Sequence, residues 1–322
     1  GTMSLVYLAC IALLSAADYE AAADKFAAFQ SEQRARAAAA AENQPQQARM
    51  HARRAEELLQ EAKALYEQAG VRGADTVGPI VGYSEVLAAQ ESYDLAVEAL
   101  ERALAIAPKD AALWTRLGAN LAKTGAAHRE EAFDALRHAT SLDATATSAW
   151  FELGHLYRKE GLLDAAAECF QRVLEQEPEH VRAAIAAAAH QARHGNMVAA
   201  ADALDELGKA AQPYDVETRL LLREALRDFD ADRHLFPDEA AHHAAYARLL
   251  YRAARLPESM LAARRAVKLA PEDYETWNFI ALVQMQVGNA EQARKAYRRS
   301  LEANPEQPQV RETLEKLEQR PE

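Results

Sequence analysis

Cysteine is scarce in this sequence. The 322 residues include only two cysteines, Cys10 and Cys169. Two cysteines cannot build the disulfide framework of a small secreted domain. Cys169 lies beside the apolar stripe of its predicted helix, where a small buried thiol is expected. This cysteine usage is compatible with a reducing compartment.

An excess of positive charge is also missing. The chain has 37 Lys and Arg residues against 49 Asp and Glu residues, which gives a formal net charge of −12. Binding to nucleic acid or to an anionic membrane depends on a basic surface. We therefore expect neither of them as a general partner.

Long apolar runs are lacking as well. The most apolar stretch, residues 5–14, has about half of the roughly 20 residues that a membrane-spanning helix needs, and no basic residue precedes it. We interpret it as a buried repeat helix and predict a cytoplasmic location. The first two residues, Gly1 and Thr2, resemble a cloning remnant. A periplasmic or membrane-anchored location is the alternative if a signal was removed upstream.

The signature motifs of enzymes are absent from the sequence. We find no glycine-rich phosphate loop, no GxSxG elbow, no HExxH motif and no paired-cysteine metal motif. His190 and His194 are four residues apart, which is the spacing of a two-histidine half-site for a metal. Two solvent-facing histidines are the simpler interpretation. We predict that the chain is not an enzyme and needs no cofactor, and we keep an enzyme or a metal-binding protein as the least favoured alternative.

One stretch, residues 147–178, has large and small residues at helical spacing. Trp150, Leu153 and Tyr157 recur at three and four residues and form an apolar stripe on a first helix. Gly154 lies where a second helix must approach, and Gly161 lies where the chain turns. The second helix has a matching apolar stripe, formed by Ala166, Phe170 and Val173. Pro178 ends the unit.

This order and spacing resemble a tetratricopeptide repeat, and similar copies recur along the chain. Trp114 precedes Trp150 by 36 residues, so we place two extra residues in the turn at 126–128. Trp277 marks a later copy, and the copy at 181–214 replaces large residues by alanine. One helical hairpin cannot cover its own apolar face, so the copies must stack. We expect the three tryptophans to occupy the same kind of inter-helix pocket.

The resemblance implies an all-α, right-handed superhelical α-solenoid of about six or seven stacked helical hairpins. The alanine-rich composition favours a bacterial protein. The loop at 229–237 carries three large apolar residues, and it is either functional or packed onto the solenoid. We divide the chain into an N-terminal repeat-like unit with a long helical hairpin (3–76), repeats (77–214), an irregular helix and loop (215–239), two repeats (240–307) and a capping helix (308–322).

Basic residues recur near the ends of successive first helices. In this family the first helices line a concave groove, and the resemblance implies that a peptide or helix of another protein lies along it. The residues form a predicted stripe for acidic groups. They are Lys123, Arg158, Lys159, Arg193 and Arg252, with His155, Arg248 and Tyr251 one turn earlier.

Two simpler explanations compete with this interpretation. The dipole at a helix C-terminus favours Lys and Arg by about 0.3–1 kcal/mol, whatever binds there. The basic residues could also pair with carboxylates of a neighbouring repeat. We predict a protein-binding scaffold or adaptor, acting in assembly, secretion or maturation. Self-assembly through the ends of the repeat stack into dimers or filaments is the alternative.

Overall fold

The computed structural model describes residues 2–41, 44–194, 196–208, 222–223, 226–227 and 238–319. Within these ranges the side chains of residues 2–15, 41, 72, 193 and 206–208 are left out of the description. The loop at 229–237 and most of 215–239 therefore lie outside the described residues. The chain divides into two compact units, Gly1–Gln176 and Glu177–Glu322, and each unit is described separately.

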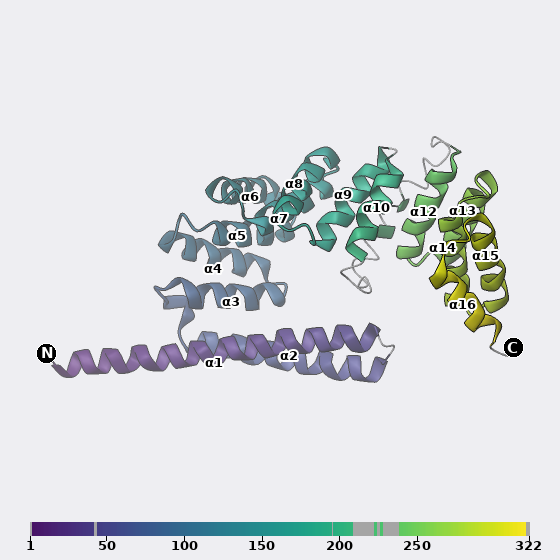
Figure 1. The fold of residues 1–322 in the computed structure, drawn as a ribbon. Coiled ribbons are helices and arrows are strands. Elements are labelled where there is room, and N and C mark those ends of the chain that lie inside the picture. The colour runs from purple at the N-terminus through teal and green to yellow at the C-terminus, as the bar shows by residue number, and fades with distance from the viewer. Residues whose placement is uncertain are drawn as a thin grey trace. The chain divides into compact units, whose positions relative to one another are not determined.

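Unit 1 begins with two long helices. Helix α1 (Thr2–Ala41) and helix α2 (Pro45–Gln68) pack along each other, as Figure 1 shows. Pro45 is suited to the first helical position, because its fixed φ is already helical and its missing N–H would have no helical partner there. Leu58, Leu59 and Tyr66 of α2 are buried. The predicted repeat helix at 5–14 is helical, and its side chains lie outside the described set.

Three hairpins follow in unit 1. They are α3 (Val77–Ala89) with α4 (Tyr93–Ile106), α5 (Ala111–Thr124) with α6 (Arg129–Leu142), and α7 (Thr147–Lys159) with α8 (Leu163–Gln176). In each hairpin the two helices contact each other, and α4 contacts α5 as α6 contacts α7. A short 3-10 turn, Ala126–His128, lies between α5 and α6. It holds the extra residues that the spacing of Trp114 and Trp150 predicts.

Unit 2 repeats this arrangement. Its described helices are α9 (Val181–Arg193), α10 (Met197–Gly208), α12 (Ala240–Arg252), α13 (Leu256–Leu269), α14 (Tyr274–Gln286), α15 (Ala290–Ala303) and α16 (Pro308–Glu318). Helix α9 buries mainly small side chains, among them Ala183, Ala188 and Ala192, which agrees with the alanines of the degenerate copy. Helix α16 packs on α15 and buries Leu314 and Leu317.

Glycines allow the close approach of helices within a hairpin. A Cβ atom on Gly154 would lie 2.9 Å from Cε1 of Phe170, so a side chain there would push α7 away from α8. Gly161 turns the chain between these helices with a φ of 76°, and Gly288 does the same between α14 and α15 with a φ of 77°. Positive φ values are accessible to glycine without a steric cost. The same local solution therefore recurs in both units.

The three tryptophans share one environment. Each indole Nε1 donates a hydrogen bond to the carbonyl oxygen six residues earlier: Trp114 to Pro108 at 2.8 Å, Trp150 to Ala144 at 2.9 Å and Trp277 to Pro271 at 2.9 Å. The three tryptophans thus recur in the same hydrogen-bonded position of their repeats. All secondary structure within the described ranges is helical, which confirms the predicted all-α class.

Candidate functional site

In unit 1 the predicted basic residues lie at the C-terminal ends of first helices. Helices α5 and α7 are in contact, and Nζ of Lys159 donates a hydrogen bond to the carbonyl oxygen of Ala122 at 3.2 Å. Lys123, the next residue along α5, has its Nζ 5.4 Å from the ring centroid of Tyr93. Both lysine side chains are exposed. The structure thus brings Lys123 and Lys159 to the same edge of unit 1.

An aromatic group lies one turn before Arg158 and Lys159 on α7. The ring of His155 meets the ring of Phe151 edge to face, with 4.5 Å between centroids, and the ring of Phe170 at 5.5 Å. His155 and Arg158 are both half-buried. Packing against two phenylalanines orients the imidazole, so α7 presents a fixed aromatic and basic surface next to α5.

In unit 2 two of the predicted arginines form an ion-pair network with α10. Arg248 pairs with Asp202, with 2.9 Å between Nη2 and Oδ1, and also with Asp205. Arg252 donates to Oδ1 of Asp205 from Nε at 3.0 Å and from Nη2 at 2.5 Å. The Arg252 side chain is 19% exposed and that of Arg248 31%. Pairing with carboxylates of a neighbouring repeat therefore applies to both arginines.

The network also changes the acid–base properties of Arg248. Burial by itself would lower the pKa of this guanidinium, but the hydrogen bonds and charges of Asp202 and Asp205 raise it above its usual value. Tyr251 packs edge to face on Phe279 of α14, with 5.6 Å between ring centroids. The side chain of Arg193 lies outside the described residues. Of the eight predicted residues, four belong to each unit.

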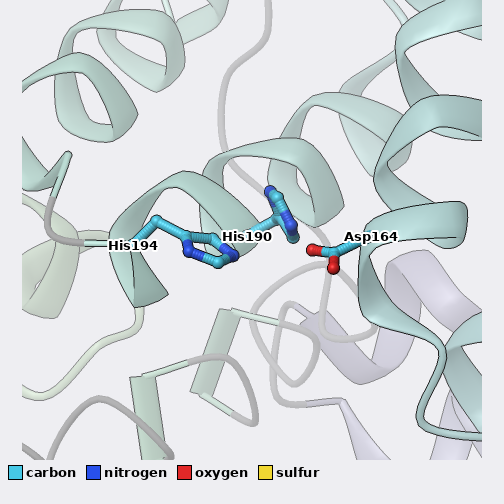
Figure 2. A group of neighbouring side chains, drawn as sticks. All are labelled: Asp164, His190 and His194. Carbon is cyan, nitrogen blue, oxygen red and sulfur yellow. The ribbon is translucent and has the colours of Figure 1, made fainter.

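His190 and His194 lie one turn apart on α9, as their spacing predicts. Their ring centroids are 4.5 Å apart, and Figure 2 shows both imidazoles on the same helix. His194 is exposed and His190 half-buried. Two imidazoles from one helix supply half of a tetrahedral metal site. Asp164, which Figure 2 also labels, belongs to unit 1.

The stacked hairpins, the glycine contacts and the repeated tryptophan bonds define an α-helical repeat protein. Three segments match family models described as tetratricopeptide repeat, at residues 77–120, 147–180 and 274–307. These segments contain α3, α4 and most of α5, then α7 with α8, and α14 with α15. The chain therefore contains tetratricopeptide repeats at these positions, and these repeats support a role as a protein-interaction scaffold.

Individual relatives resemble the chain over limited stretches. The peroxisomal targeting signal receptor of Candida albicans is 38% identical over 88 residues, which are 27% of this chain and 14% of that protein. A crystal structure of MamA has 18% identity and a TM-score of 0.42, covering 49% of this chain and 92% of that one. The C-terminal part of a TPR repeat-containing protein from Cytophaga hutchinsonii has 13% identity and a TM-score of 0.44, with coverages of 79% and 93%.

The match to the curated relative thus spans a small fraction of that protein's length. No helix within the described ranges combines the length and the apolar character that crossing a membrane requires.

Proposed function

We propose that the chain holds a peptide segment or helix of a partner protein on its first-helix face, as an adaptor or assembly factor. The proposal uses the predicted basic residues: Lys123, His155, Arg158 and Lys159 in unit 1, and Arg193, Arg248, Tyr251 and Arg252 in unit 2. The observation that supports it most is the placement of Lys123 and Lys159 at one exposed edge. In a chain with a net charge of −12, such an edge attracts carboxylates of a partner selectively.

The existing contacts leave binding capacity at this edge. A lysine ammonium has three donors, and Lys159 uses one of them on Ala122. Nζ of Lys123 lies over the ring face of Tyr93, and this contact gives its three donors no acceptor oxygen. Both ammonium groups can therefore donate charge-assisted hydrogen bonds to a partner carboxylate. Phe151 and His155 supply an adjacent aromatic surface for an apolar side chain of the same segment.

Unit 2 contributes less to the proposed binding. A partner carboxylate at Arg248 or Arg252 would have to share the guanidinium groups with Asp202 and Asp205, which already accept from them. We therefore expect charge reversal in unit 1 to weaken binding, and charge reversal of Arg248 or Arg252 to act mainly on stability.

The experiment uses peptides selected on the intact chain from a displayed library of random sequences. Their affinity is then measured by calorimetry for the double variant Lys123→Glu/Lys159→Glu. We expect a loss of about tenfold or more, equivalent to about 1.4 kcal/mol, with unchanged helicity and melting temperature. The matched control is Lys109→Glu/Arg172→Glu, which changes the net charge of unit 1 by the same amount at two other exposed positions. An equal loss in both variants, or no loss in either, contradicts the proposal.

Self-assembly remains the alternative proposal, because the ends of a repeat stack resemble its internal interfaces. Light scattering at rising protein concentration separates the two functions. A protein that stays strictly monomeric rules self-assembly out and leaves the partner-binding proposal intact.

A further inference from the structure

Both units contain a groove of the same construction. In unit 1 it lies between α6 and α8 with α7 as its floor and has a volume of about 540 Å³. In unit 2 it lies between α13 and α15 with α14 as its floor and has a volume of about 650 Å³. Equivalent lining residues differ by 127 in number, as Trp150 and Trp277 do. The two grooves can therefore be compared position by position.

The fold accounts for the residues that both grooves share. Each floor has the tryptophan and, three residues later, a buried Leu153 or Ile280. Each second helix has an arginine paired with a glutamate three residues on. These pairs are Arg172 with Glu175 at 3.3 Å and Arg299 with Glu302 at 2.9 Å.

The grooves differ in three exposed positions that change the charge. Unit 1 has Ser141, Glu168 and Gln171, and unit 2 has Lys268, Lys295 and Arg298 at the equivalent places. The unit 1 groove is lined by two arginines and two glutamates, so its formal charge is balanced. The unit 2 groove is lined by one carboxylate, Glu302, and by five cations: Arg264, Lys268, Lys295, Arg298 and Arg299. Because unit 1 folds the same groove without this excess, the repeat architecture does not require it.

The cations of the unit 2 groove can exchange their present ion-pair partners for a ligand carboxylate. Lys295 pairs with Glu291 at 2.6 Å and Arg298 with Glu318 of α16 at 2.6 Å, and their side chains are 57% and 55% exposed. Ion pairs at this exposure stabilise a protein by about 0–1 kcal/mol, so a ligand carboxylate can replace them at low cost. Arg264 and Lys268 of α13 are exposed, and neither has an ion-pair partner within the part of the chain that the structure describes.

We propose that the unit 2 groove, between α13 and α15, binds an acidic, partly apolar peptide segment of a partner protein. Cations stand on both walls, and Val267, Trp277, Ile280 and Ala296 give an apolar floor. Carboxylates of the segment pair with the walls, while its apolar side chains cover the indole and the isoleucine. A nucleic-acid backbone would gain from the walls alone, and the overall charge of −12 opposes its approach.

This surface is separate from the one in the proposed function. It includes none of the eight residues of the proposed function, and its cations lie on second helices, while the first helix α14 forms its floor. The chain would therefore have two basic surfaces that bind acidic ligands, one at the ends of first helices and one between second helices. The two can be removed independently by substitution.

The main test replaces the three unit 2 residues by their unit 1 equivalents: Lys268→Ser, Lys295→Glu and Arg298→Gln. The probe is a fluorescein-labelled peptide with three repeats of Glu-Glu-Leu-Glu, and binding to the intact chain is followed by anisotropy. We expect the triple variant to bind at least about tenfold more weakly than the wild-type chain, with an unchanged helical signal. A peptide with Gln in place of Glu should bind the wild-type chain as weakly as the Glu peptide binds the triple variant.

The reciprocal exchange, Ser141→Lys/Glu168→Lys/Gln171→Arg, keeps the proposal testable by a gain of function. Placed in the triple variant, it should restore peptide binding through the unit 1 groove.

Several results would overturn the inference. They are equal binding by wild type and triple variant, no binding by wild type, and tighter binding of a single-stranded oligonucleotide than of the peptide at the same salt concentration. If only the variant Lys123→Glu/Lys159→Glu loses binding of the Glu-containing peptide, the peptide binds at the ends of the first helices instead. Lys109→Glu/Arg172→Glu controls for the change in net charge, because it lowers the charge by the same amount as the triple variant.

Discussion

Gly118 offers a direct test of how closely the two helices of a hairpin approach. In the change Gly118→Ala, the new Cβ would lie 2.6 Å from Cγ of Leu136 and 3.1 Å from the backbone oxygen of Ala132, both on α6. Leu136 is fully buried, so its side chain has no open space to enter. The oxygen of Ala132 is a backbone atom of α6, so it cannot move unless the helix moves. Helix α5 must therefore move away from α6.

Two opposing effects set the size of the change. Overpacking a dense core costs about 1–3 kcal/mol, whereas alanine is favoured over glycine inside a helix by about 1 kcal/mol. The expected outcome is a net loss of about 1 kcal/mol in the free energy of unfolding, and at most about 2. Gly73→Ala is the control, since no atom lies within 4 Å of a Cβ there and its φ is not positive. It should leave stability unchanged or raise it by up to about 1 kcal/mol.

Urea unfolding, followed by the helical circular dichroism signal, measures both variants. The reasoning fails if Gly118→Ala is as stable as the wild-type chain while Gly73→Ala behaves as expected. In that case the contact between α5 and α6 would be loose enough to accept a methyl group, and the repeat geometry would not depend on glycine at this position.

Two further changes test the electrostatics and the core. Asp205→Ala leaves the partly buried Arg248 and Arg252 without the carboxylate that they share, so we expect a loss of about 1–3 kcal/mol in urea unfolding; a loss below about 0.5 kcal/mol would show that water replaces the carboxylate. Burial raises the pKa of the Cys169 thiol to about 11, and only the thiolate reacts readily. In a Cys10→Ser background, Cys169 should react slowly with a thiol reagent at neutral pH and rapidly in urea, and rapid labelling of the folded chain would contradict its burial.

The repeat pattern was predictable because it depends on the spacing of residues within a single hairpin. The tryptophan positions and the turn glycines each specify a short-range geometry, and the structure and the three family matches agree with them. The extra turn at Ala126–His128 also followed from counting residues between Trp114 and Trp150. Such features depend on neighbours within one hairpin, so a single sequence is sufficient to place them.

Pairing between repeats was considered from the sequence, but the particular partners could not be predicted. Arg248 and Arg252 pair with aspartates more than 40 residues earlier, on α10, and the irregular segment 215–239 hides their equivalence to neighbouring positions. The groove cations were missed for another reason. Charged residues on second helices are common on a solvated face, so one repeat alone does not single them out. Comparison of residues 127 apart reveals Lys268, Lys295 and Arg298 as differences between two equivalent grooves.

The 3-10 turn Ala126–His128 shows where this chain accommodates inserted residues. It lengthens one hairpin, yet Trp150 of the next hairpin makes the same indole bond as Trp114 and Trp277 do. The extra length is absorbed before the following repeat begins, so the periodicity is not propagated rigidly along the polypeptide. A short tag or reporter segment inserted at this corner should leave the register of every later hairpin intact, which makes it a natural position for attaching a probe.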